Sequence, residues 1–363
     1  MKILLDARFY GLENGGLGRY SINLIKSLAL LDKTNNYSLL LTNKYFDKLV
    51  LPDNFKKIRV DIKPYGLSEQ ILLPLIIWKE NPDIVHYMHF NAPLINFKPF
   101  IVTIHDMIMH KSKGLESTTL NPIFYRFKQI AYKYVFSHAV KNSKTIIVPS
   151  MTINNELSEY FKFYKDKIKV VYLGLDYEIQ LVKSNVPKNR NFIYVGNAYP
   201  HKNLDLLISA VKKAKVKLDI STSKNYFSNK LKVLVNDENA EEYVRVHDFL
   251  DDQKVIQLYR DSAAFIYPSL IEGFGFQGLE AIASGTILIA SDIPVFREVY
   301  KDYAIYFDPK NVDSLVSAIN KSVNLSGSER KTIIENAQNY IKKYSWENTA
   351  GKTLSLYQEV AVK

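Results

Sequence analysis

Two glutamates, Glu272 and Glu280, stand on either side of a glycine-rich stretch, residues 273–279. The glycines let backbone approach a ligand closely, and residues 276–284 predict a short helix whose start offers free N–H groups and a positive dipole end to an anion. Carboxylates accept paired hydrogen bonds from vicinal hydroxyls, as on a ribose or a hexose. The pattern therefore favours a phosphate with sugars on both sides. The alternative interpretation is two solvated glutamates around a helix start.

Apolar segments enclose this stretch and must position it. Residues 263–267 predict a strand closed by Pro268, and residues 286–290 predict another. Together they form a strand–loop–helix–strand unit of a parallel α/β sheet. Its loop lies at the carboxyl end of a strand, which is where open sheets bind ligands.

The same form occurs twice more along the chain. Residues 192–195 predict a strand, followed by a glycine turn in which Lys202 stands at a helix start and can meet a phosphate. Near the amino end, a strand at residues 3–7 leads into a glycine-rich loop at residues 14–20 and then into a helix. That loop lacks the third glycine of a dinucleotide fingerprint, and a simple tight turn is its alternative interpretation.

Two further predicted strands, at residues 83–88 and 100–105, end in clusters that contain histidines. His105, which precedes an aspartate at the ligand edge of the sheet, can donate a hydrogen bond to a sugar hydroxyl or a phosphate. Metal binding is the rival interpretation. His86 and His89 lie three apart on an extended chain and point to opposite faces, so we predict no metal ligands.

The stretch from Glu272 to Glu280 resembles the Glu, seven residues, Glu motif of retaining glycosyltransferases of family four, which have the GT-B fold; Gln277 replaces the usual proline. Three other segments agree. Residues 15–20 match the family's Gly-Gly-x-Gly-Arg loop, residues 196–203 match Gly-x-x-x-Pro-x-Lys-Asn, and His105 matches the histidine of Ile-His-Asp.

The resemblance implies an α/β fold of the GT-B type, with two Rossmann-like domains facing across a cleft and a C-terminal helix returning to the first domain. We expect an acceptor-binding domain at residues 1–178, a donor-binding domain at 190–343 and the returning helix at 344–363. Residues 177–191 lack periodicity and predict the linker.

The family's site residues carry over position by position. The resemblance makes Glu272, His105 and Lys202 catalytic, with Glu280 on the nucleotide ribose, Glu272 on the donor sugar and Lys202 on the diphosphate. The full set of expected donor-binding residues is Gly16, Gly18, Arg19, Gly196, Asn197, Lys202, Glu272, Gly273, Phe274, Gly275, Phe276 and Glu280. Asn197 stands where the family often has a second base.

No Asp-x-Asp triplet occurs in the sequence, so we expect a metal-free site with no cofactor other than the nucleotide-sugar substrate. The family retains anomeric configuration, and we see no carboxylate placed as a nucleophile, which favours front-face substitution. The stretch 83–106 and the glycine loop look most similar to bacterial mannosyltransferases of surface polysaccharide assembly. That similarity implies GDP-mannose as donor and a glycan or lipid-linked glycan as acceptor.

Two other classes of function need weighing. A nucleotide-dependent oxidoreductase is disfavoured because the glycine fingerprint is incomplete and the strand at residues 37–42 ends in Thr42-Asn43, without an acid. A non-enzymatic nucleic-acid binder is suggested by the formal net charge of +11, but no recognition-helix, zinc or aromatic-platform motif is present. We therefore expect no nucleic-acid partner.

Composition sets the remaining bounds. The chain of 363 residues is too long for one ordinary core, contains no cysteine, and begins with charge too early for a signal peptide. We expect a cytoplasmic protein. The charge indicates an anionic partner, or only a lysine-rich surface. Residues 121–144 are aromatic and basic and predict either a core helix or an interfacial one. We expect weak, salt-sensitive association with the anionic inner face of the cytoplasmic membrane.

Overall fold

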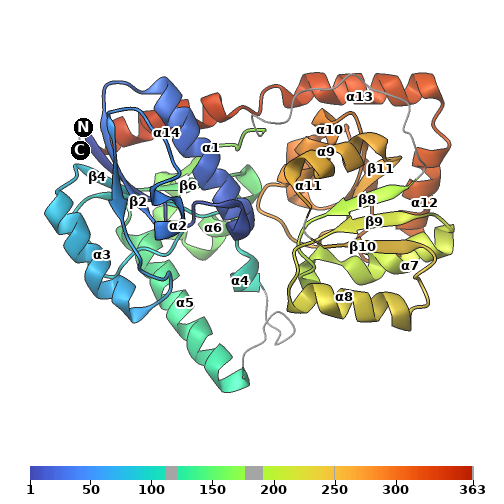
Figure 1. Cartoon of the computed structure of the whole chain (residues 1–363), viewed down its shortest axis with the longest axis horizontal. Helices are drawn as coiled ribbons and strands as arrows, with labels where there is room; N and C mark the ends of the chain where they lie inside the picture. Colours follow the sequence, from blue (N-terminus) through green and yellow to red (C-terminus); the bar gives the residue numbers. More distant parts are fainter. Residues whose placement is uncertain (112–120, 176–190, 249, 362–363) are drawn as a thin grey trace. The chain divides into compact units, whose positions relative to one another are not determined.

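The structure, a computed structural model, describes residues 1–111, 121–175, 191–248 and 250–361. The chain divides into two compact units. Unit 1 comprises Met1–Gly174 together with Tyr344–Lys363, and unit 2 comprises Leu175–Lys343 (Figure 1). Residues 176–190, where the linker is expected, lie outside the described residues.

Unit 1 is built on a parallel sheet whose described strands follow the order β3-β2-β1-β4-β5-β6-β7. The central strand reads as a continuous apolar run, since Ile3, Leu4 and Leu5 are fully buried, as expected when helices cover both faces of a parallel sheet. The strands are β1 Lys2–Asp6, β2 Asn36–Leu41, β3 Phe55–Arg59, β4 Ile84–Tyr87, β5 Phe100–Thr103, β6 Thr145–Val148 and β7 Ile168–Val170.

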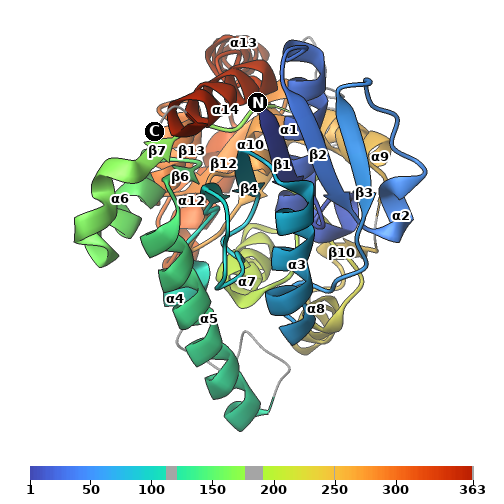
Figure 2. The same cartoon turned by 90° about the vertical axis from the view of Figure 1, so that its left-hand side faces the viewer.

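The helices of unit 1 occupy two faces of this sheet. Helix α1 connects β1 to β2 and so runs toward the β3 edge of the sheet, whereas α3, α5 and α6 lead toward the β7 edge. Because such crossovers are right-handed, α1 lies on one face of the sheet and α3, α5 and α6 lie on the other (Figure 2). Buried residues of α3, α5 and α6 share one core. The helices are α1 Gly15–Leu31, α2 Asn43–Phe46, α3 Leu67–Glu80, α4 Ile108–Lys111, α5 Pro122–Asn142 and α6 Met151–Tyr160, with 3-10 turns at Leu12–Asn14 and Lys162–Lys167.

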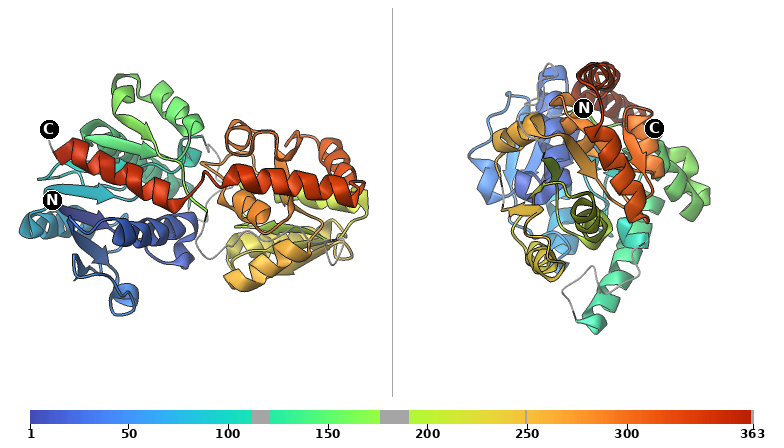
Figure 3. Two further views of the ribbon diagram at one scale, coloured as in Figure 1. Left: turned by 90° about the horizontal axis from the view of Figure 1, so that it is seen from above. Right: turned by 90° about the vertical axis from the view of Figure 1, so that its right-hand side faces the viewer.

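The C-terminal helix α14, Trp346–Ala361, belongs to unit 1 and lies along α1 (Figure 3). The Thr349 hydroxyl donates to the Tyr172 carbonyl at 2.8 Å, and the Tyr357 hydroxyl lies 2.6 Å from His86 Nδ1 in the buried interior. A Cβ on Gly174 would lie 2.1 Å from the backbone nitrogen of Trp346, so the chain needs glycine where it leaves this unit. The predicted return of the C-terminal helix is confirmed.

Unit 2 repeats the architecture with the described strand order β10-β9-β8-β11-β12-β13, all parallel. The strands are β8 Phe192–Val195, β9 Leu218–Ser221, β10 Val244–His247, β11 Ala264–Tyr267, β12 Ile287–Ser291 and β13 Ile305–Phe307. The helices are α7 Leu204–Ala214, α8 Tyr226–Asp237, α9 Asp252–Asp261, α10 Phe276–Ala283, α11 Pro294–Tyr300, α12 Val312–Val323 and α13 Gly327–Ile341, with a 3-10 turn at Pro200–Lys202. Two Rossmann-like units are thus confirmed.

Strand β3 begins at Phe55, whose ring stacks on Tyr37 of β2 with ring centroids 4.3 Å apart. One local prediction was wrong. The glycine-rich segment expected as a loop at residues 14–20 is helical from Gly15 onward. Among the described residues, no helix has the length and apolar character needed to cross a membrane.

Candidate active site

Two of the predicted ligand loops lie together in unit 2. Strands β8 and β11 pair in parallel, so the turns that follow them emerge at the same sheet edge. The Leu270 N–H donates to the His201 carbonyl at 2.8 Å, and the Asn203 side-chain amide donates to the Pro268 carbonyl at 3.1 Å. Residues 196–203 and 268–275 therefore form one connected surface.

An ion pair joins these loops. Lys202 Nζ lies 2.5 Å from Glu272 Oε1, with the two side chains only 12% and 10% exposed. The Ser269 hydroxyl donates to the same carboxylate oxygen at 2.7 Å. Burial raises the pKa of Glu272, but the charge and hydrogen bonds of Lys202 and Ser269 outweigh it and hold that pKa below its usual range. Glu272 is therefore ionised at neutral pH.

Helix α10 begins beside this pair. Gly275 precedes it with φ 105°, a conformation suited to glycine. A Cβ there would lie 2.3 Å from the Tyr300 hydroxyl, which donates to the Gly275 carbonyl. Glu280, one turn into the helix, is 5% exposed. The helix start, with Gly273 and Phe274 buried before it, thus stands between the two glutamates as predicted.

Hydrogen bonds from two buried tyrosines explain the residues at Gln277 and at Gly196. The Tyr267 hydroxyl of β11 donates to Gln277 Oε1 at 2.7 Å, so the residue that replaces the family's proline ties α10 to its preceding strand. The Tyr194 hydroxyl donates to the Asn197 carbonyl at 2.8 Å, and a Cβ on Gly196 would lie only 2.8 Å from the same hydroxyl. Tyr194 therefore shapes the turn after β8.

Two glycines of unit 1, Gly16 and Gly18, were both expected to bind the donor, but their surroundings differ. A Cβ on Gly18 would lie 1.8 Å from the Gly11 carbonyl oxygen, whereas a Cβ on Gly16 would meet nothing within 4 Å. Gly18 therefore allows the loop before α1 to cross the helix closely. Gly16 leaves open space beside the helix start, where a ligand can approach, and Arg19 is partly exposed in the following turn.

This difference makes a matched pair of variants. Gly18→Ala is expected to lower the free energy of unfolding by about 1–3 kcal/mol, because its methyl group overlaps backbone. Gly16→Ala should fold normally but bind the nucleotide-sugar donor more weakly. Chemical denaturation and calorimetric titration measure the two effects. Equal destabilisation by both substitutions would contradict the assignment.

His105 lies at the carboxyl end of the unit 1 sheet, as predicted, but its hydrogen bonding differs. Its Nε2 is 2.8 Å from the Met88 carbonyl oxygen, and since a carbonyl only accepts, Nε2 carries the proton. Burial lowers the pKa of His105 to about 4, despite this bond. At neutral pH the ring is uncharged, and Nδ1 can accept a hydrogen bond from a sugar hydroxyl rather than donate one.

Buried His86 provides a pH-dependent prediction. Burial lowers the pKa of its imidazole to about 3, whereas an unfolded histidine titrates near 6.5. Because the unfolded chain binds more protons between these values, acidification favours unfolding. Between pH 7 and 5, His86 alone should remove about 2 kcal/mol of stability.

Tryptophan fluorescence during urea unfolding measures this effect, since Trp78 and Trp346 both lie in unit 1. His86→Gln, which keeps hydrogen-bonding groups beside Thr103 and Tyr357, is the control and should show a shallower dependence on pH. The same slope in both proteins would rule out His86 as the source.

A buried charge cluster in unit 1 was not anticipated. Arg8 binds Asp6 through two hydrogen bonds of 2.8 and 2.6 Å, and its Nη2 lies 2.5 Å from Glu69 Oε1. The Asn91 amide donates to the other oxygen of Glu69 at 2.6 Å. The sequence signal was an Asp-Ala-Arg directly after an apolar strand. The cluster joins β1, α3 and the chain after β4 at the ligand edge of the sheet.

The predicted site residues thus fall into two groups. Gly16, Gly18, Arg19 and His105 belong to unit 1, and the others belong to unit 2. The described residues include no group of three or more His, Cys, Asp or Glu side chains placed to hold a metal ion.

Similarity to known proteins extends over nearly the whole chain. The O-antigen chain mannosyltransferase RfbU of Salmonella typhimurium is 26% identical over 362 residues, which cover 93% of this chain and 94% of that protein. The O-antigen chain mannosyltransferase B of Escherichia coli is 23% identical, covering 99% of this chain and 100% of the relative. The structure of Anabaena HepE, solved with UDP and glucose, superposes with a TM-score of 0.73 at 16% identity, covering 98% of this chain and 99% of that one.

Two family models match consecutive parts of the chain. Residues 14–179 match Glycosyltransferase Family 4, and residues 176–340 match Glycosyl transferases group 1. With two parallel Rossmann-like sheets and this site, the protein is a glycosyltransferase of the GT-B fold. Both models describe glycosyltransferases, and together they cover residues 14–340. This activity decides against an oxidoreductase and against a non-enzymatic protein as the function of the chain.

Proposed function

We propose that the protein is a retaining, metal-independent mannosyltransferase that moves mannose from GDP-mannose to a glycan or lipid-linked glycan in surface polysaccharide assembly. The observation that carries this proposal is the buried Lys202–Glu272 pair beside the start of α10, with buried Glu280 on the same helix. The names of the two relatives support mannose and a surface polysaccharide.

Each group has a role in the proposed reaction. Glu280 accepts hydrogen bonds from the ribose hydroxyls, and Glu272 accepts them from the donor sugar. Lys202, together with the N–H groups of Phe274 and Gly275, stabilises the diphosphate. Nδ1 of His105 accepts a hydrogen bond from a sugar hydroxyl. Because negative charge grows on the leaving group in the transition state, donors held in place there raise the rate as well as the affinity.

In the proposed front-face substitution, the bond from the anomeric carbon to the diphosphate oxygen breaks as the acceptor oxygen bonds to the same face. The acceptor hydroxyl proton passes to the departing diphosphate, so configuration is retained. No carboxylate of the described site is assigned a nucleophilic role.

Nucleotide sugars that differ in base and sugar test the proposal. GDP-mannose should raise the unfolding midpoint most and should be hydrolysed slowly without acceptor. Preferential stabilisation and turnover of a UDP-sugar would refute the mannose assignment while leaving a transferase. Absence of stabilisation by every nucleotide sugar would refute the donor site.

Activity should also persist in excess chelator, because Lys202 and Arg19 supply positive charge and the sequence lacks an Asp-x-Asp triplet. Transfer rates measured in EDTA and in magnesium-saturated EDTA should agree. Loss in EDTA with recovery on adding magnesium or manganese would contradict the metal-independent mechanism.

A further inference from the structure

The side-chain amide of Gln277, the second residue of α10, has an unused hydrogen-bond donor. Its Oε1 accepts a hydrogen bond from the Tyr267 hydroxyl at 2.7 Å. Because the oxygen of the amide faces that hydroxyl, Nε2 with its two N–H groups points away from it. Within the described part of the chain, Nε2 has no partner, and it is open to solvent. The start of α10 thus presents a side-chain donor as well as backbone N–H groups.

Tyr267 fixes the orientation of this amide. It is the last residue of β11 and is only 1% exposed. Its ring packs against Phe296 and Phe265, with centroids 4.5 and 5.3 Å away. Burial raises the pKa of Tyr267 well above its usual range, and the charge of Glu272 raises it further, so the hydroxyl keeps its proton. A glutamine held in this way loses less conformational entropy when a ligand binds.

The same tyrosine lies beside the group assigned to the donor sugar. Lys202 Nζ is 5.9 Å from the centroid of the Tyr267 ring and 2.5 Å from Glu272 Oε1. Glu272 and the amide of Gln277 therefore belong to one cluster, in which the carboxylate accepts hydrogen bonds and Nε2 donates them. A sugar hydroxyl both donates and accepts, so it can use both groups. A phosphate oxygen beside the ionised carboxylate would instead meet like charge.

This donor depends on the residue that the chain has at position 277. The usual residue of the motif there is proline, whose side chain has no hydrogen-bonding group and whose backbone nitrogen carries no hydrogen. Helix α10 begins as the motif predicts without that proline. Glutamine at this position therefore adds a contact that proline cannot make.

We propose that Gln277 is a specificity-determining residue for the donor sugar: Nε2 donates a hydrogen bond to a hydroxyl of the hexose, and Tyr267 positions the amide for that contact. The inference deepens the proposed function and rests on it, since it requires a nucleotide sugar at the start of α10. A contact to the diphosphate is the competing outcome.

Gln277→Met tests the contact, because methionine keeps the length of the side chain but has no N–H group. The affinities for GDP and for GDP-mannose are measured by competition with a fluorescent nucleotide, before hydrolysis proceeds. GDP should bind as to wild type, whereas GDP-mannose should bind roughly two- to tenfold more weakly, as expected for one hydrogen bond between uncharged groups.

Gln257→Met is the matched control. Gln257 is an exposed residue of α9, and its Nε2 donates to Asp261 of the same helix at 2.8 Å. The substitution makes the same chemical change in unit 2 and should leave both affinities unchanged. An equal effect of the two methionine variants on GDP-mannose would overturn the assignment to Gln277.

Tyr267→Phe separates positioning from contact. This variant keeps the amide but removes the hydroxyl that orients it, so part of the same loss of GDP-mannose affinity is expected. In the Gln277→Met background, Tyr267→Phe should cause no further loss, because the amide is already absent. The full loss in both backgrounds would show that Tyr267 acts on another group and would overturn its positioning role.

Nuclear magnetic resonance of protein labelled with ¹⁵N-glutamine observes the amide directly. The side-chain signals of Gln277 are those that disappear in Gln277→Met. GDP-mannose should shift them strongly, and GDP should shift them little. Equal shifts with both ligands would contradict a contact to the hexose.

The outcomes distinguish this inference from the proposed function. Equal weakening of GDP and GDP-mannose by Gln277→Met would place the amide on the diphosphate, and unchanged affinity for both would exclude a contact with the donor. Failure of wild type to bind any nucleotide sugar would instead refute the proposed function. If wild type prefers another nucleotide sugar, the same comparison with that sugar and its nucleotide decides the role of Gln277.

Discussion

Glu272→Ala is expected to reduce sugar transfer by about 10²–10³-fold while leaving nucleoside diphosphate binding near its wild-type value. The magnitude is that of removing one preorganised contact to the reacting group. The two effects separate because we assign Glu272 to the donor sugar and Glu280 to the nucleotide. Steady-state transfer assays give the first quantity, and calorimetric titration with GDP gives the second. Equal losses in both would refute this division of roles.

The ion pair with Lys202 supplies the control. Removing Glu272 alone leaves a nearly buried ammonium group without its partner 2.5 Å away, which should lower the free energy of unfolding by about 3–5 kcal/mol. Lys202→Ala should destabilise similarly. The double variant K202A/E272A leaves no unpaired buried charge, so its free energy of unfolding should partly recover. Its rate of sugar transfer should remain low. Recovery of transfer in the double variant would show that Glu272 acts only through stability.

The site in unit 2 was largely predictable because its parts are local in sequence. Residues 263–290 contain the strands, the glycines and the helix, so the position of Glu272 and Glu280 around the helix start followed from the sequence. The Lys202–Glu272 pair did not, since it depends on β8 lying next to β11 in the sheet. Nothing in the sequence pairs strands that are separated by two other strands.

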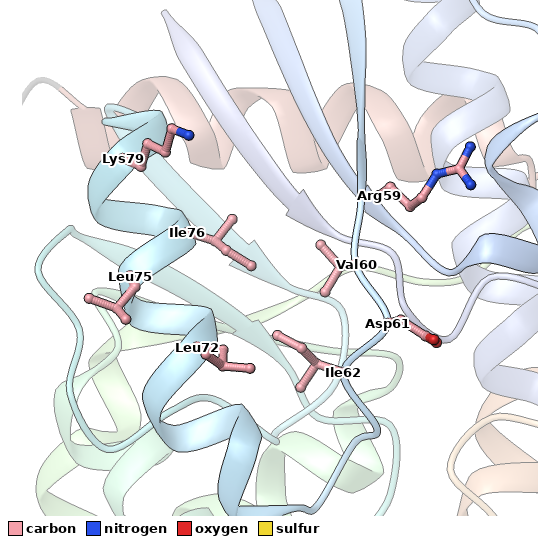
Figure 4. Close-up of a pocket in the computed structure, with 8 residues that line it drawn as sticks. All are labelled: Arg59, Val60, Asp61, Ile62, Leu72, Leu75, Ile76 and Lys79. Atoms are coloured by element: carbon pink, nitrogen blue, oxygen red, sulfur yellow. The ribbon is translucent and has the colours of Figure 1, made fainter.

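Other features depend on tertiary contacts. The tautomer of His105 is set by the Met88 carbonyl, which comes from the neighbouring strand's end. The helical start of α1 arises because Gly18 tolerates the Gly11 carbonyl against it. The sequence does not show which side of α3 stays exposed. Leu73 and Ile77, which face the core, are as apolar as the exposed Leu72 and Leu75, which line an open groove beside the same helix (Figure 4). Periodicity cannot tell which side of an apolar helix remains uncovered.

Glu280→Ala is expected to weaken GDP binding by roughly ten- to a hundredfold. A hydrogen bond to a charged group contributes about 1.5–3 kcal/mol, which corresponds to that range of affinity. Glu280→Gln, which preserves volume at a position 5% exposed, should show a smaller loss. Thermal unfolding of both variants separates binding effects from folding effects.

The ligand can be varied as well as the protein. If Glu280 holds the ribose hydroxyls, wild type should bind 2′-deoxy-GDP more weakly than GDP, because the carboxylate then loses a donor. Glu280→Ala has no carboxylate to accept a hydrogen bond from the 2′-hydroxyl, so this variant should bind GDP and 2′-deoxy-GDP almost equally. The coupling between the protein change and the ligand change isolates their mutual contact. Undiminished discrimination by the Ala variant would place the ribose on other residues and remove Glu280 from the role assigned to it.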